Sequence, residues 1–94
     1  MSERTAPALA KLDTLLSFVA ALPGSAIRTQ LVDEAEALKR EVAAFHMEAI
    51  RFRMFRVDRM IIAAGDPGEI RRTFDDLRHT LETAGFHTRS HSSP

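Results

Sequence analysis

Arg51, Arg53, Arg56 and Arg59 lie close together in the middle of the chain, within the stretch AAFHMEAIRFRMFRVDRMIIAA. Guanidinium groups bind carboxylates and phosphates bidentately, so such a cluster is typical of nucleic-acid surfaces, anion pockets and ion pairs between helices. On a helix these positions point in four directions and do not form one basic stripe. Arg56 and Arg59 continue an apolar stripe, so their surroundings should decide between these roles.

We favour a structural role, in which Arg56 and Arg59 reach Asp33, Glu34 or Glu41 of a second subunit and fix the register of the pair. The alternative is a regulator that binds a nucleic acid or a small anionic ligand through the cluster. Lys plus Arg and Asp plus Glu both number 13, so net charge does not attract nucleic acid. An enzyme with inward arginines is a third hypothesis. The candidate anion or partner contacts are Arg53, Arg56 and Arg59.

The histidines offer little chemistry. His46 would lie on a helix, but Glu48 follows closely and would repel a phosphoryl group, which argues against phosphotransfer. His87 and His91 have metal-ligand spacing but fall in a polar terminal segment, and His79 has only surface-like neighbours. Cysteine is absent. We therefore expect no catalytic, cofactor or metal residues and no cofactor.

Apolar residues recur at helical spacing throughout the chain and predict an all-α fold. Expected helices cover about 7–22, 25–64 and 67–84. Pro23 and Gly24 end the first, and Ser25 would cap the second. Gly65 closes the second, and Asp66 begins a capping box for the third. We expect Gly85 to end the third helix in a Schellman motif, with a single domain over 1–86 and a disordered tail over 87–94.

The predicted central helix has no Pro or Gly and would be about 60 Å long, matched by the two shorter helices end to end. Such a chain leaves apolar side chains in water, so we predict a coiled-coil-like homodimer that completes a four-helix-type bundle. A competing arrangement breaks the helix near Ala43–His46 and folds a four-helix monomer. The candidate interface residues are Phe45, Met47, Ile50, Phe52, Met54, Phe55, Ile61 and Ile62.

No apolar run approaches the roughly 20 residues that span a bilayer, which predicts a cytoplasmic protein with no membrane association. Its frequent Ala and Arg suggest a bacterial source. We expect a small non-catalytic interaction or regulatory protein that forms a homodimer. The Phe and Met side chains of the central segment also suit docking of a heterologous protein helix. Neither the partner nor the biological process follows from the residues.

Overall fold

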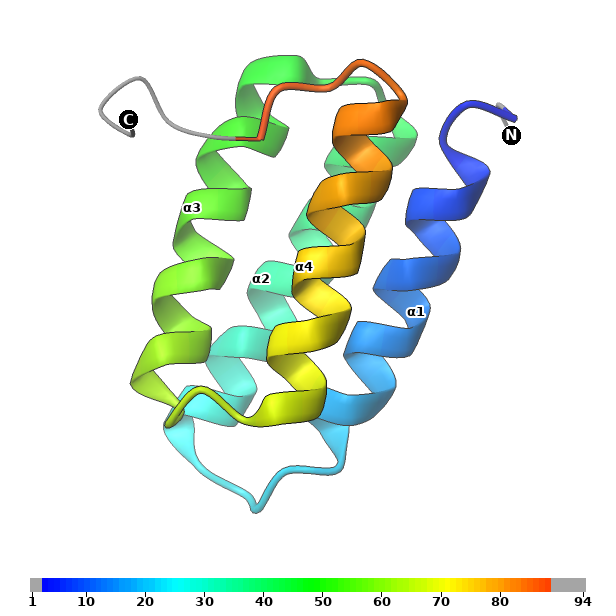
Figure 1. Ribbon diagram of the computed structural model, residues 1–94. Helices are drawn as coiled ribbons and strands as arrows, with labels where there is room; N and C mark the ends of the chain where they lie inside the picture. The colour runs from blue at the N-terminus through cyan, green and yellow to red at the C-terminus, as the bar shows by residue number, and fades with distance from the viewer. Residues whose placement is uncertain (1–2, 89–94) are drawn as a thin grey trace.

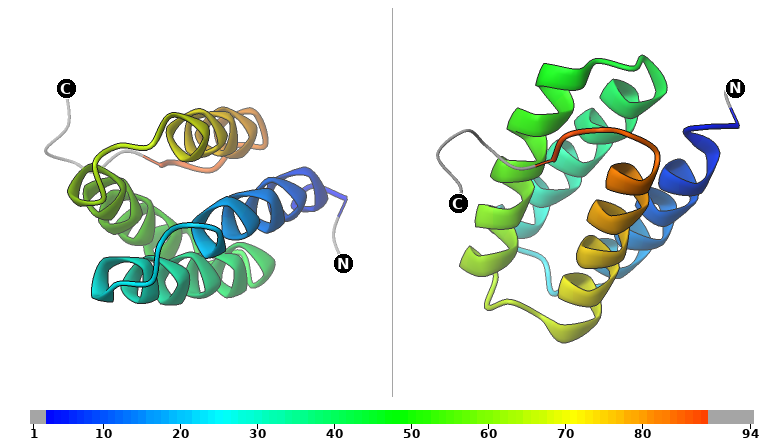
Figure 2. Two further views of the ribbon diagram at one scale, coloured as in Figure 1. Left: turned by 90° about the horizontal axis from the view of Figure 1, so that it is seen from below. Right: turned by 45° about the horizontal axis from the view of Figure 1, so that its top comes forward.

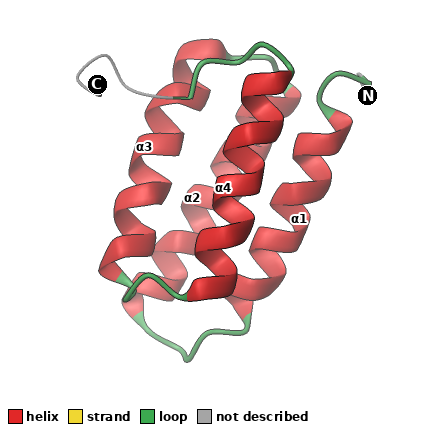
Figure 3. Cartoon of the chain, in the orientation of Figure 1, coloured by secondary structure: helices red, strands yellow, loops and turns green. Residues whose placement is uncertain are grey.

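The computed structural model describes residues 3–88, and these residues form helices without any strand (Figure 3). Successive helices run antiparallel (Figure 1). The all-α prediction is confirmed. The helices are α1 (Ala6–Ala20), α2 (Ala26–Ala43), α3 (Met47–Ala63) and α4 (Gly68–Thr83).

The first two helices begin as their sequences indicate. Pro7 lies in the first turn of α1, where its missing N–H is not needed. Ser25 has an extended backbone and its hydroxyl accepts a hydrogen bond from the backbone N–H of Arg28 at 3.1 Å, which confirms the predicted N-cap of α2. Leu12, Leu15 and Val19 recur along one face of α1 and are fully buried.

The predicted single helix over 25–64 is wrong, because the chain turns at Ala44–His46 between α2 and α3. Phe45 adopts a left-handed backbone with φ of 59°. Its N–H bonds to the carbonyl of Val42 at 3.1 Å, and the N–H of His46 reaches back to the carbonyl of Glu41 at 3.1 Å. These two bonds define a Schellman motif with Phe45 at the C′ position.

Gly65 and Gly85 end α3 and α4 in the same way, with positive φ and the same pair of backbone bonds. Both ends were predicted from glycine, which enters the left-handed region without steric cost. Phe45 does so against a cost of about 1–2 kcal/mol. Its ring packs on that of Phe86, with centroids 5.6 Å apart, and this tertiary contact helps to offset the cost. This turn therefore has no glycine or proline to mark it in the sequence.

The predicted capping box at the start of α4 is also wrong. Asp66 has φ of 53°, α4 begins at Gly68 after Pro67, and no side chain caps it. The Asp66 carboxylate instead accepts a hydrogen bond from Nε of Arg71 at 2.7 Å. A charged partner one turn into α4 has thus replaced the backbone amides that an N-cap would bind.

The core lies between the four helices of one chain (Figure 2). Each of α1 and α3 packs extensively on α2, α4 packs on α1, and the contact between α3 and α4 is the slightest. The radius of gyration is 12.3 Å, which is typical of a folded chain of this length. The core is therefore filled without a second subunit, so the fold does not need a dimer to complete it. Its largest fully buried side chains include Phe74, Leu12, Leu31, Leu38, Ile50, Met54, Ile61, Ile70, Leu77 and Leu81.

After α4 the chain crosses the end of the helices toward α3 (Figure 1). Phe86 is buried there, directly after the Schellman motif at Gly85. Thr88 is also buried, and its hydroxyl donates to Glu82 at 2.8 Å while its carbonyl accepts from Nη1 of Arg78 at 2.9 Å. Thr88 is the second residue of the segment 87–94 for which the sequence predicts a tail. Its remaining residues, 89–94, lie outside the described part of the chain.

Candidate functional site

Arg53 forms the centre of an ion-pair network between α2 and α3. Its Nε and Nη2 donate to the two carboxylate oxygens of Glu41 at 3.1 and 2.8 Å, a bidentate pair, and its Nη1 donates to Glu34 at 2.9 Å. Nε of Arg56 donates to the same oxygen of Glu34 at 3.0 Å. The side chains of Arg53, Glu34 and Glu41 are 21%, 16% and 18% exposed, so water screens this network poorly.

The pKa values of these groups reflect the pairing. Burial alone raises the pKa of Glu34, but the hydrogen bonds from Arg53 and Arg56 outweigh burial and hold that pKa below its usual 4.5. The hydrogen bond with Glu41, followed by that with Glu34, raises the pKa of Arg53. Glu34 and Arg53 are therefore both held in their charged forms.

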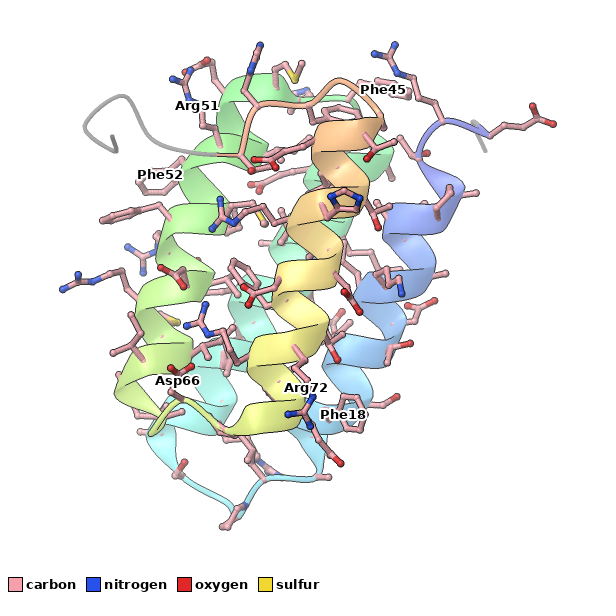
Figure 4. The ribbon with its side chains drawn as sticks, in the orientation of Figure 1. Phe18, Phe45, Arg51, Phe52, Asp66 and Arg72 are labelled. Carbon is pink, nitrogen blue, oxygen red and sulfur yellow. The ribbon has the colours of Figure 1, made fainter. Side chains whose placement is uncertain are left out.

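The other two arginines of the cluster lie elsewhere. Arg51 pairs with Glu48 within α3 at 3.2 Å, and Figure 4 places it near the N-terminal end of α3, beside the C-terminal crossing. Arg59 is exposed, and no carboxylate within residues 3–88 pairs with it. Glu34 and Glu41, which we expected to pair with arginines of a second subunit, pair with Arg53 and Arg56 of their own chain. Asp33 is exposed.

This arrangement disfavours a basic ligand-binding surface. Arg53 is neutralised by two carboxylates, and Arg56 shares one of them, so neither offers a free guanidinium to an incoming phosphate. Nor do Arg56 and Arg59 face an internal polar pocket, because both are exposed to solvent. The network instead joins α2 to α3.

The predicted interface residues separate into three groups. Ile50, Met54 and Ile61 are fully buried in the chain's own core, so they do not face a partner. Phe45 and Met47 are 42% and 37% exposed beside the turn, where Phe45 contacts Phe86. The remaining three are exposed on α3: Phe52, Phe55 and Ile62.

These three side chains lie opposite the buried side of α3. Phe52, Phe55 and Ile62 are 56%, 46% and 52% exposed. Figure 4 shows Phe52 projecting away from the other helices. We define the α3 outer face by this stripe together with the charged positions that fall within it, Glu48 and Arg59. Large exposed apolar side chains on one helix face are a feature of residues 3–88 that the fold of the single chain does not explain.

A second cluster of charges bridges α3 and α4. Nη1 of Arg71 donates to Asp58 at 2.7 Å, and its Nε donates to Asp66 at 2.7 Å. Burial lowers the pKa of Arg71, but the hydrogen bonds with Asp66 and Asp58 more than reverse this and raise it. Beside this pair is a shallow polar groove of about 480 Å³ that includes His79 and Glu82. Within the groove, Arg71 pairs with Asp58 and also with Asp75 at 3.6 Å. Arg71 therefore joins α3 to α4, the two neighbouring helices that pack least.

The histidines occupy positions without convergent ligands. His46 precedes α3 and is exposed, and its side chain makes no capping hydrogen bond. His79 and His87 are exposed, and His91 lies outside the described residues. Within residues 3–88, the His, Asp and Glu side chains form no group of three that could hold a metal ion.

Comparison with known proteins gives no family assignment. No protein-family model, no curated protein and no solved structure matches this chain. Across residues 3–88, none of the helices has both the length and the apolar character that a membrane span requires. The α3 outer face is therefore the main basis for assigning a role.

Proposed function

We propose that this protein is a small, non-catalytic helical interaction protein that assembles as a homodimer through the α3 outer face. The observation that carries the proposal is the exposure of Phe52, Phe55 and Ile62 on the side of α3 turned away from the core. The core needs no partner, so dimerisation here would join two folded chains and would not complete a fold.

Burial of this face is energetically favourable. Covering one large apolar side chain contributes about 1.5–3 kcal/mol, and these three are each only about half covered in the single chain. Aromatic residues at the centre of an interface and arginines around it are typical of protein contacts. The guanidinium carbons of Arg53 and Arg56 already lie 5.7 and 5.8 Å from the centre of the Phe52 ring, which restricts that ring before any partner binds.

Sedimentation equilibrium tests this proposal. The wild-type chain should show a concentration-dependent mass that rises from 10.5 kDa toward twice that value at micromolar to submillimolar concentrations. Phe52→Glu should keep the mass of a single chain over the same range, because it places a charge in the middle of the face. Gln30→Glu is the matched control, since Gln30 is exposed on α2 and the change adds the same charge.

A constant mass of 10.5 kDa for the wild-type chain would refute the proposal. If Gln30→Glu weakened association as much as Phe52→Glu, net charge and not the α3 outer face would govern assembly. The alternative regulator, which binds a nucleic acid or an anion through Arg51–Arg59, has less support because carboxylates already occupy Arg53 and Arg56.

A further inference from the structure

The α3 outer face has a regular seam. Its members alternate at spacings of four and three residues, the spacing with which one helix presents a continuous line to another. In order they are Glu48, Phe52, Phe55, Arg59 and Ile62.

This seam is complementary to itself when it is reversed. Phe52 and Phe55 lie symmetrically about the midpoint between Arg53 and Met54, and so do Glu48 and Arg59. A two-fold dimer uses one surface twice, so that surface must match its own reverse in both shape and charge. Aromatic side chains then meet in the middle, and opposite charges meet at both ends.

We infer that a second copy of this chain packs antiparallel along α3, with the two-fold axis between Arg53 and Met54. This inference rests on the proposed function and specifies its geometry. Phe52 of each copy lies against Phe55 of the other. Glu48 of each copy pairs with Arg59 of the other, which supplies the carboxylate that Arg59 does not find among residues 3–88 of its own chain.

Other pairings of the seam are less favourable. A parallel pair would set Glu48 against Glu48 and Arg59 against Arg59, which is repulsive. An antiparallel pair shifted by one heptad would set Phe55 against Arg59, or Glu48 against Phe52. Of these registers, only the unshifted antiparallel one satisfies the aromatic and the charged positions together.

The flanks of the seam are compatible with this pairing. Arg51 and Arg56 lie on opposite sides of it, and each already pairs with a carboxylate of its own chain, Glu48 and Glu34 respectively. Glu48 has an 80% exposed side chain, so a second partner can reach it. With 17 residues, α3 is about 25 Å long. A single helix pair of that length gives a small interface, for which we expect micromolar rather than nanomolar affinity.

Charge reversal provides the decisive experiment. Glu48→Arg alone and Arg59→Glu alone should each weaken self-association about tenfold or more, because each turns both symmetry-related pairs repulsive. An equimolar mixture of the two variants should recover wild-type affinity as a heterodimer, and so should the double variant as a homodimer. Glu36→Arg and Arg72→Glu serve as matched controls, since both positions are exposed on other helices. Circular dichroism verifies that every variant is folded.

The outcomes separate this geometry from the proposed function. If Phe52→Glu abolishes association but the charge reversals do not, the α3 outer face is the interface and the antiparallel register is wrong. If the mixture of single variants stays monomeric while each control dimerises, the register is likewise refuted. If the wild-type chain is monomeric, both proposals fail. An interaction of α3 with an unrelated protein would leave the wild-type chain monomeric and belongs to this last outcome.

Cysteine cross-linking gives an independent readout of direction. Glu48→Cys and Arg59→Cys should form a disulfide with each other in a mixture, and neither should cross-link with itself. In the antiparallel pair, identical positions of the two chains lie about 16 Å apart along the axis, which is too far for a disulfide. Self-cross-linking of each variant would demonstrate a parallel pair and overturn the inference. The natural chain has no cysteine to interfere.

Discussion

Replacing Arg53 by Met tests whether the ion-pair network joins α2 to α3 as the structure indicates. The change removes three hydrogen bonds at once and leaves the Glu41 carboxylate, which is 18% exposed, without its bidentate partner. Glu34 keeps the hydrogen bond from Arg56. Methionine fills much of the space of the arginine stem, so the loss should be mainly electrostatic and not a cavity effect.

The magnitude follows from the burial of the pair. Removing one partner of a buried ion pair costs about 3–5 kcal/mol, because it leaves an uncompensated charge. Here each carboxylate retains some exposure and Glu34 retains a second arginine, so we expect a loss of about 2–3 kcal/mol in the free energy of unfolding. For a chain of this size that corresponds to a fall of about 10–20 °C in the melting temperature.

Urea unfolding followed by circular dichroism measures this loss. Arg72→Met is the matched control, because Arg72 is exposed on α4, and it should change stability by less than about 0.5 kcal/mol. The triple variant Arg53→Met, Glu34→Gln, Glu41→Gln should regain much of the stability, since no buried charge is then left unpaired. A loss for Arg53→Met no greater than that for the control would refute our account of the network.

The effect should also depend on pH. The pKa of Glu34 is lowered in the folded chain, so its contribution is present above the unfolded value of about 4.5 and is lost as pH falls through the folded value. The difference between wild type and Arg53→Met should therefore be largest near pH 7 and shrink between about pH 5 and 3. A difference that is constant over this range would contradict an electrostatic origin.

Three smaller predictions concern the turns. In urea unfolding, the free energy of unfolding of Phe45→Gly should exceed that of Phe45→Ala by about 1 kcal/mol, because both variants lose the ring and only glycine adopts φ of 59° freely. A continuous helix would give the opposite order. Gly85→Ala should lower the free energy of unfolding by about 1 kcal/mol, because alanine is strained at φ of 95°. The new Cβ would also displace the flexible end of Arg4, which lies 2.7 Å away. An unchanged melting temperature would contradict this prediction. Thr88→Val should lower the free energy of unfolding by about 1 kcal/mol, because it removes the hydrogen bond to Glu82. An unchanged rate of amide hydrogen exchange at the C-terminal end of α4 would argue against that contact.

The helical character of the chain and most helix ends were predictable because local signals define them. Apolar spacing gave α1 and α4, Ser25 capped α2, and glycine ended α3 and α4 through the left-handed conformation that it alone adopts without cost. These features depend on residues a few positions apart. They would hold in almost any tertiary arrangement.

The partners of the arginines were not predictable in the same way. A straight helix keeps Glu34 and Glu41 on the same rod as the arginines that follow, so the sequence predicts pairing between two subunits. Once the chain turns at Phe45, α3 lies antiparallel to α2, and Arg53 meets both carboxylates within one chain. One unrecognised turn therefore changed an intermolecular contact into an intramolecular one.

The sequence by itself determined an all-helical chain, most helix ends and the apolar character of the segment after His46. The tertiary structure decided where that segment turns, because the turn depends on a Phe45 backbone that local propensity disfavours and that a distant residue, Phe86, helps to hold. It also decided which apolar residues are core and which are surface, burying Ile50, Met54 and Ile61 and exposing the α3 outer face. Burial depends on which helices pack together, and helical spacing alone does not specify that.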